Sequence, residues 1–319
     1  MNALTSLSTQ PTKRVREDGP IIGVEQLTKS YAKPKGGQFN AVDNVTFEVS
    51  AGETYAMLGP NGAGKSTTIE ILEGHRKPTS GAARVLGCRP YKASPAFRAR
   101  IGVVLQEATD AGELGVAESL RNLAVFYPNP RSVDEVVAAV GLEEKASARI
   151  KALSGGQRRR ADVAMGLIGN PELLFLDEPT TGFDPEARRA FWELIRSLGQ
   201  DGTTVVLTTH YLDEAQQLAD RLGIIAGGRL IAEGTPTTIG GPEVRTPRVR
   251  WTDQEGRHEQ ITTEPASLIQ RISDGGRREP ELLEVFRPSL EDIYLQLLDH
   301  QKSVDPKPAS EPRNRQDLP

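Results

Sequence analysis

The sequence GPNGAGKS, at residues 59–66, decides the fold. It matches the pattern G-x-x-x-x-G-K-[ST] and stands between a short apolar run at 54–58 and a segment with helical spacing at 66–73. A strand, a glycine-rich turn and a helix in this order indicate a P-loop. The glycines let backbone N–H groups point at phosphate oxygens, and the start of the helix adds positive partial charge. We therefore predict a nucleoside triphosphate site here, and not a glycine-rich turn with a chance lysine.

The residues of this loop have separate expected roles. Lys65 is expected to reach the β- and γ-phosphates, and the hydroxyl of Ser66 is expected to ligate Mg²⁺. The predicted phosphate-binding set is Gly59, Pro60, Asn61, Gly62, Ala63, Gly64, Lys65, Ser66 and Thr67.

A pair of acids follows a later apolar run. Residues 173–179 read LLFLDEP, which predicts a buried strand that ends in Asp177 and Glu178. Beside a P-loop, Asp177 would hold Mg²⁺ directly or through water, and Glu178 would polarise the water that attacks the γ-phosphate. The two acids could instead cap the next element, but the P-loop upstream favours the catalytic interpretation.

Two more polar residues end predicted strands. Gln106 follows IGVVL at 101–105, and His210 follows TVVLTT at 204–209. Polar residues at the carboxyl ends of strands in an α/β sheet face the ligand crevice. Gln106 could equally begin a surface loop, and His210 could be a satisfied polar residue with no role at the site.

The region between these strands changes character. Helical patterns dominate residues 107–168, and the last helix begins at LSGGQ, residues 153–157. Ser154 and Gln157 form a capping box, which accounts fully for those two residues. Gly155 and Gly156 weaken a helix start unless something approaches the backbone closely, and a phosphate is the expected visitor. The arginines at 158–160 are predicted to form a solvated face.

Tyr31 and Asp184 have open interpretations. Tyr31 precedes the P-loop and could stack on an adenine base, or it could be a half-exposed tyrosine at a strand end. Asp184 followed by proline predicts the N-cap of a helix that runs to Leu198 and is closed by Gly199. Capping alone could account for Asp184.

Composition excludes several classes of protein. The 319 residues carry 39 Lys and Arg against 43 Asp and Glu, a net charge of −4, so we expect no nucleic-acid partner. The single cysteine, Cys88, permits no intramolecular disulfide and fits a reducing cytoplasm. The sequence contains no apolar run near the length of a membrane span, so a membrane role is expected to come through a partner chain.

This ordered set of motifs resembles the nucleotide-binding subunit of ABC transporters, from residue 21 to about 236. LSGGQ is the signature motif of that family. The resemblance implies that two such domains pair head to tail, with each ATP held between the P-loop of one and the LSGGQ of the other. It also implies that Tyr31 stacks on adenine and that Gln106 contacts Mg²⁺ and water. Asp184 becomes the D-loop aspartate and His210 the switch histidine that contacts the γ-phosphate.

Shorter stretches narrow the resemblance. HYLDEA at 210–215, IAEGTP at 231–236 and PSLEDIYLQL at 288–297 are similar to ATPases of type-2 ABC exporters, including the daunorubicin-resistance (DrrA-like) drug-efflux group. Phe183 stands where leucine is commoner in the D-loop, and this departure leaves the assigned roles intact.

The expected fold class is α/β: a P-loop NTPase of the ABC ATPase type with an inserted helical subdomain and a small C-terminal α+β appendage. The expected boundaries are a disordered leader at 1–18, an ABC ATPase domain at 19–241 with its helical subdomain at about 107–168, an accessory domain at 242–300 and a disordered tail at 301–319.

The resemblance implies an ATPase subunit that powers a separate membrane permease from the cytoplasmic face of the membrane, for export of a drug-like or hydrophobic small molecule. Its implied partners are that permease and a second ATPase copy, and its cofactors are ATP and Mg²⁺. The alternative is a soluble ABC ATPase acting on ribosomes or DNA, but such proteins usually carry two modules or long coiled coils. An inactive regulatory module is disfavoured by the intact Lys65, Asp177 and Glu178.

Overall fold

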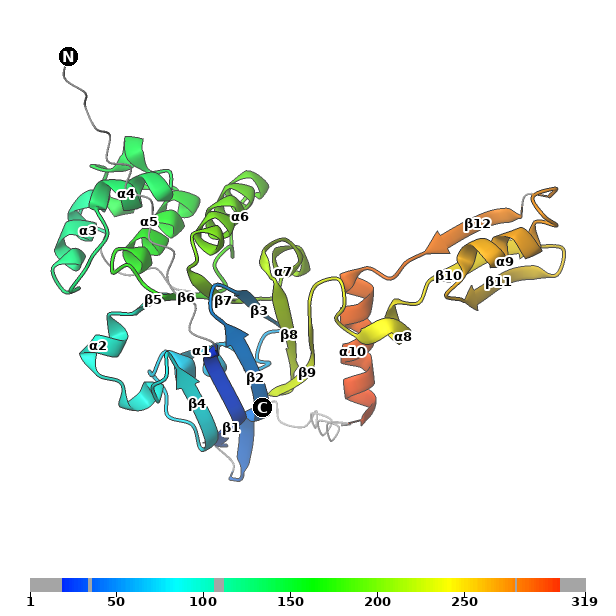
Figure 1. Ribbon diagram of the computed structural model, residues 1–319, viewed down its shortest axis with the longest axis horizontal. Coiled ribbons are helices and arrows are strands. Elements are labelled where there is room, and N and C mark those ends of the chain that lie inside the picture. The colour runs from blue at the N-terminus through cyan, green and yellow to red at the C-terminus, as the bar shows by residue number, and fades with distance from the viewer. Residues whose placement is uncertain (1–18, 34–35, 106–111, 279, 305–319) are drawn as a thin grey trace, which may run out of the picture. The chain divides into compact units, whose positions relative to one another are not determined.

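The computed structural model describes residues 19–33, 36–105, 112–278 and 280–304 (Figure 1). The chain divides into two compact units, Met1–Leu230 and Ile231–Pro319. This division falls before residue 241, where the sequence placed the end of the ATPase domain. The expected leader at 1–18, and residues 305–319 of the expected tail, lie outside the described residues.

A six-stranded sheet has the order β5-β6-β7-β3-β8-β9; its first five strands lie in the first unit, and β9 begins there. In that order, the strands are β5 (Ile101–Val104), β6 (Leu173–Asp177), β7 (Thr204–Thr209), β3 (Thr54–Leu58), β8 (Arg221–Ala226) and β9 (Arg229–Gly234). The first five pair in parallel. Every residue of β3 and β7 is buried, which explains why these strands read as unbroken apolar or threonine-rich runs.

The strand order positions the site. β7 lies between β3 and β6, so the chain leaving each of these three strands emerges at one edge of the sheet. The P-loop follows β3, Asp177 ends β6 and His210 follows β7. In open α/β sheets, ligands bind outside this carboxyl edge.

A second, antiparallel sheet has the order β2-β1-β4. It consists of β1 (Pro20–Ala32), β2 (Gln38–Ser50) and β4 (Ser80–Val85). The sequence indicated only short pieces of β1 and β2, whereas each strand is 13 residues long. Their register sets Tyr31 opposite Phe39 next to the turn that joins the two strands. Phe47 of β2 stacks on Tyr55 of β3, with ring centroids 5.3 Å apart, and so joins the two sheets in one core.

The helices of the first unit follow the predicted order, except that the short helix Pro95–Arg98 was not predicted. They are α1 (Lys65–Leu72), α2 (Pro95–Arg98), α3 (Val116–Ala124), α4 (Val133–Ala139), α5 (Gly155–Leu167), α6 (Pro185–Gln200) and α7 (Leu212–Leu218). α5 packs against β5, and this contact requires two glycines. A Cβ on Gly102 would lie 2.3 Å from the carbonyl oxygen of Gly166. The α3–α5 group is the helical subdomain expected from the sequence (Figure 1).

The expected end of α6 is wrong. The helix continues through Gly199 to Gln200, and the chain turns at Gly202, whose φ is +86°. Gly199 lies in the last turn, where a glycine weakens a helix without ending it. The predicted hairpin at Gly227 and Gly228 is confirmed, since both have positive φ, as a two-residue turn between β8 and β9 requires.

The second unit is the expected α+β appendage. Its sheet has the order β11-β10-β12. Its elements are α8 (Gly241–Arg245), β10 (Arg248–Asp253), β11 (Gly256–Ile261), α9 (Pro265–Ile272), β12 (Glu281–Phe286) and α10 (Leu290–Val304). Val249 and Leu268 are buried where α9 covers β10. α10 continues to Val304, so the expectation that order ends at residue 300 is corrected. No helix among the described residues has both the length and the apolar character needed to cross a bilayer.

Candidate nucleotide-binding site

The P-loop is shaped by two glycines that accept no side chain. A Cβ on Gly59 would lie 2.2 Å from the carbonyl oxygen of Ile225, and a Cβ on Gly64 would lie 2.2 Å from that of Ala41. Gly64 also has φ +106° and caps α1. A backbone of this shape leaves the first N–H groups of α1 free to bind an anion, because no side chain covers them.

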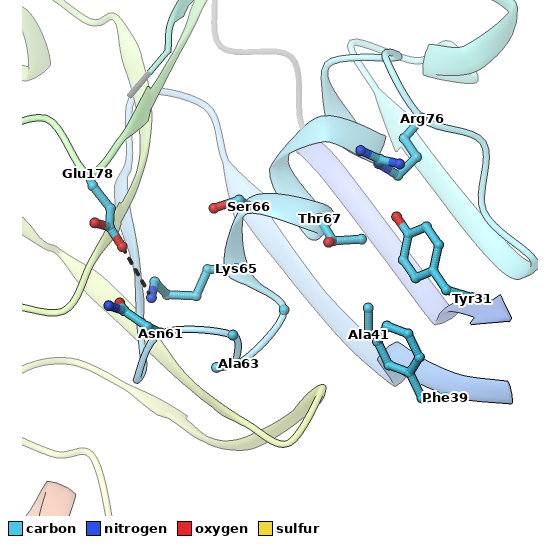
Figure 2. A pocket seen from close by; sticks show the side chains of 12 residues that line it. Tyr31, Phe39, Ala41, Asn61, Ala63, Lys65, Ser66, Thr67, Arg76 and Glu178 are labelled. Atoms are coloured by element: carbon cyan, nitrogen blue, oxygen red, sulfur yellow. Dashed lines mark ion pairs between the residues drawn. The ribbon is translucent and has the colours of Figure 1, made fainter. Parts of the chain in front are cut away.

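Lys65 lies in the cradle of this loop. Its side chain is 4% exposed, and its Nζ donates hydrogen bonds to the carbonyl oxygens of Gly59 (2.8 Å) and Pro60 (3.2 Å). The same Nζ lies 3.5 Å from Oε1 of Glu178 (Figure 2). Because this ammonium is already buried among acceptors, it can exchange one of them for a phosphate oxygen at small further desolvation cost.

The acids after β6 are fixed by its neighbours. Asp177 Oδ1 accepts hydrogen bonds from the hydroxyls of Ser66 (3.3 Å) and Thr208. Glu178 adopts φ +43°, a strained conformation for a residue with a side chain. Its N–H donates to Oγ1 of Thr208 at 3.0 Å, which holds the turn. Its Oε2 lies 3.3 Å from Nδ1 of His210. The carboxylate of Glu178 therefore lies between Lys65 and His210.

The donor set of Ser66 and Asp177 fits Mg²⁺. A hydroxyl and a carboxylate oxygen lie 3.3 Å apart, one at the start of α1 and the other at the end of β6. Mg²⁺ is usually held by one or two protein oxygens together with phosphates and water. These two residues would hold the cation.

The surrounding pocket has a volume of about 650 Å³. It is lined by Tyr31, Phe39, Ala41, Asn61, Gly62, Ala63, Gly64, Lys65, Ser66, Thr67, Arg76 and Glu178 (Figure 2). Sequence reasoning missed Phe39, Ala41 and Arg76, because β1–β2 pairing and the end of α1 bring them to the pocket. The available signal was the glycine pair at 36–37 between Tyr31 and Phe39, which favours a hairpin with two aromatic residues near its turn.

The LSGGQ segment caps α5 as predicted. Ser154 Oγ accepts from the N–H of Gln157 (3.3 Å), and Gln157 Oε1 accepts from the N–H of Ser154 (3.1 Å). The two glycines differ. A Cβ on Gly156 would lie 3.1 Å from Cβ of Ala187, whereas a Cβ on Gly155 would meet nothing within 4 Å. Within the described part of the chain, residues 154–157 do not line the pocket that contains Lys65.

Arg159 corrects the prediction for the arginine run. The side chain was expected on a solvated face, yet the residue is 7% exposed. It donates to the carbonyl oxygens of Pro179 (3.0 Å), Asp177 (2.9 Å) and Leu105. The carbonyls of Asp177 and Pro179 flank Glu178, and that of Leu105 follows β5. Together they give the buried guanidinium the hydrogen-bond acceptors that it needs. Three adjacent arginines gave no sign that one of them points inward.

Three further residues were predicted to belong to the site: Asp184, His210 and Gln106. Asp184 is the N-cap of α6, and its Oδ1 accepts from the N–H of Ala187 at 2.8 Å. This bond accounts for Asp184 within one chain, and its role toward nucleotide stays a prediction. His210 lies at the site beside Glu178, with its side chain 30% exposed. Gln106 lies outside the described residues.

A carboxyl group that the sequence did not indicate is buried beneath the site. Glu73 follows α1 and is 4% exposed. Burial raises the pKa of Glu73 to about 8, and the nearby carboxylates of Asp177 and Glu70 add to the shift. His75 Nδ1 lies 3.1 Å from Glu73 Oε2. Glu73 is therefore neutral in the folded protein over a pH range in which an exposed glutamate is charged.

This shift predicts a pH dependence of stability. The folded state holds the Glu73 proton between the ordinary pKa of 4.5 and about 8, so its contribution is fully present below pH 4.5 and is lost as pH rises through 8. Glu73→Gln mimics the neutral acid. At pH 9 the variant is expected to exceed the wild type in free energy of unfolding by about 1–3 kcal/mol, with little difference at pH 4.5. Denaturant unfolding of both proteins at pH 4.5 and pH 9 measures this difference. An equal change in the free energy of unfolding with pH for the variant and the wild type would contradict the prediction.

The fold and the site together define a P-loop nucleotide-binding domain with a signature helix. A family model described as ABC transporter matches residues 42–181. The chain is 38% identical over 308 residues to the daunorubicin/doxorubicin resistance ATP-binding protein DrrA of Streptomyces peucetius, covering 89% of this chain and 88% of that protein. It is 37% identical over 303 residues to Nod factor export ATP-binding protein I of Cupriavidus metallidurans, covering 87% and 97%. The chain belongs to the ABC transporter family as an ATP-binding subunit and is an ATPase.

Solved structures agree with this assignment. The chain is similar to a dimeric bacterial ABC transporter cassette, with a TM-score of 0.60 and 26% identity over 67% of this chain and 98% of that one. A dimeric post-hydrolysis state of an ATP-binding cassette, bound to ADP and Pi, matches with the same TM-score, identity and coverage.

Proposed function

We propose that two copies of this chain bind and hydrolyse ATP between them and thereby drive a membrane permease that exports a hydrophobic small molecule. The pairing of two copies rests on one observation. Within one chain, the start of α5 does not line the pocket around Lys65, and a Cβ on Gly155 would meet nothing within 4 Å. A phosphate bound in the pocket of one copy would meet the open backbone at Gly155 of its partner. The two relatives described above are named for drug resistance and Nod factor export, which supports export as the direction.

The residues of the pocket have separate roles in ATP hydrolysis. Lys65 binds the β- and γ-phosphate oxygens, and the N–H groups of residues 62–67 surround the β-phosphate. Glu178 orients a water for attack on the γ-phosphorus and accepts its proton, while the bond to the bridging oxygen breaks and ADP leaves with the electron pair. His210 holds Glu178 from the far side and contacts the γ-phosphate. Ser66 and Asp177 would hold Mg²⁺, which would supply positive charge beside the phosphates.

Positioning and charge stabilisation account for most of this catalysis. Tyr31 takes part in binding the base, and Ser154, Gly155, Gly156 and Gln157 of one copy close on the γ-phosphate of the other. Gln106 and Asp184 relay the state of the nucleotide between the copies and toward the permease. The ATPase pair works at the cytoplasmic face of the membrane as a peripheral subunit of the transporter.

The test uses the full chain with a candidate permease, a membrane protein to be sought in the neighbouring reading frames. Co-expression is expected to give a complex that purifies together, in which ATP hydrolysis in lipid vesicles is faster than that of the isolated chain. A basal ATPase that neither co-purifies with that permease nor responds to it would overturn the transport role and leave the ATPase assignment standing. Salt-sensitive binding to ribosomes or DNA would favour the soluble alternative.

A further inference from the structure

The turn that carries Glu178 is held from two sides. Glu178 has φ +43°, a conformation that persists only where its surroundings fix it. On one side, Oγ1 of Thr208 in β7 accepts the N–H of Glu178 at 3.0 Å. On the other side, the guanidinium of Arg159 donates to the carbonyl oxygens of the two residues that flank Glu178. The backbone of the turn is therefore tied both to β7 and to α5.

Arg159 uses three different nitrogens for three carbonyl groups. Its Nε donates to Pro179 (3.0 Å), its Nη2 to Asp177 (2.9 Å) and its Nη1 to Leu105. A planar guanidinium can span acceptors that a single ammonium cannot. Because Arg159 is buried, water cannot readily replace these bonds when the side chain is removed.

The charge of Arg159 is balanced within α5 and not at the nucleotide pocket. Oδ2 of Asp162, three residues further along the helix, lies 3.9 Å from Nη1 of Arg159. This distance is longer than a hydrogen bond, so the guanidinium keeps its donors for the carbonyl groups. Among the described residues, Arg159 is not one of those that line the pocket around Lys65. An effect of Arg159 on hydrolysis would therefore pass through the turn.

We propose that Arg159 is a positioning residue for ATP hydrolysis: it holds the carbonyl groups on either side of Glu178 and thereby fixes the place of the Glu178 carboxylate. This inference rests on the proposed role of Glu178 and adds to it the residue that holds its turn. The two carboxylate oxygens lie 3.5 Å from Nζ of Lys65 and 3.3 Å from Nδ1 of His210. A rotation of the turn would change both distances, and a displacement of about 1 Å at a catalytic group can cost about 100-fold in rate.

The experiment measures kcat, KM and the Kd for ATP of the full chain with and without Arg159→Met. Methionine fills much of the space of arginine and donates nothing to the carbonyl groups. The kcat is expected to fall about 10-fold or more, with the Kd for ATP unchanged, because the pocket keeps all of its own residues. Arg159→Lys takes its place if methionine prevents folding. It keeps the positive charge beside Asp162 but supplies one nitrogen in place of three, so kcat should fall in this variant too.

A double-mutant cycle separates positioning from a general loss of structure. A residue that acts through the Glu178 carboxylate has no further effect once that carboxylate is replaced. Arg159→Met should therefore lower the residual kcat of Glu178→Gln by less than about 2-fold. Leu167→Ala is the matched control, since Leu167 is fully buried on the same helix. It should lower stability in denaturant unfolding and leave kcat unchanged.

Two results would overturn the inference. One is a wild-type kcat in the folded Arg159→Met protein, or in Arg159→Lys where methionine prevents folding. The other is the same fold-loss of kcat from Arg159→Met in the wild-type and Glu178→Gln backgrounds, which would show a general effect on the fold. Wild-type turnover by Glu178→Gln alone would instead overturn the proposed role of Glu178, and this inference with it.

Discussion

Glu178→Gln is expected to lower the kcat of ATP hydrolysis about 100-fold or more while ATP stays bound. The amide has the size of the carboxylate and can still face Lys65 and His210, which lie 3.5 Å and 3.3 Å from the two carboxylate oxygens. It cannot accept the proton of the attacking water. The turn itself is held by the backbone bond from Glu178 to Thr208, which the substitution leaves in place. Catalysis is lost and the fold is kept.

The same variant should hold the two copies together. The γ-phosphate persists in Glu178→Gln, so the contacts that it makes across the pair persist too. Phosphate release measures the first effect, and light scattering with and without ATP and Mg²⁺ measures the second. Glu186→Gln, an exposed acid in the first turn of α6, is the matched control and should behave as the wild type. Sustained turnover by Glu178→Gln would remove Glu178 from its role as the activating base.

The central strands β3, β6 and β7 could be predicted from sequence because they are buried on both faces. Burial of this kind produces short apolar runs with sharp ends, and β3, β6 and β7 were readable to the residue. The polar β11, which reads GRHEQI, offered no such signal and was missed. An antiparallel strand with one solvated face can carry few apolar residues, and its pairing with β10 then supplies the stability.

Within the site, too, the part formed by one continuous segment could be predicted from sequence, and the part assembled from distant segments could not. The phosphate-binding loop is one continuous segment, residues 59–67, so the sequence pattern alone identifies all of its residues. The base end is assembled from β1, β2 and the end of α1, and only the register of a long hairpin sets Phe39 beside Tyr31. Arg159 was misread for a related reason: its acceptors are carbonyl groups of other elements, which no side-chain pattern reveals.

Gly155→Asp is expected to abolish most hydrolysis without loss of ATP binding by the single chain. A Cβ at this position would meet nothing within 4 Å in its own chain, so we expect the variant to fold normally. The added carboxylate would instead face the γ-phosphate of the partner copy, and repulsion between like charges would prevent closure. Gly156 is a poorer choice, because a Cβ there would crowd Ala187 in the same chain. A loss of hydrolysis could then result from misfolding. ATP binding by calorimetry and phosphate release by the full chain separate the two effects.

Mixing variants tests whether the site is shared between copies. Lys65→Ala disables the pocket of its own chain, and Gly155→Asp disables the signature of its own chain. In a mixed pair of these two chains, one site combines both defects, and the other combines an intact pocket with an intact signature. Hydrolysis by the mixture should therefore exceed that of either variant alone. A mixed pair of the double variant with the wild type, purified free of wild-type pairs by different affinity tags, has a defect in each site and should hydrolyse little ATP. Equal hydrolysis by the two purified mixed pairs would contradict a site shared across the pair, because only a pocket and a signature contributed by different copies make these arrangements unequal.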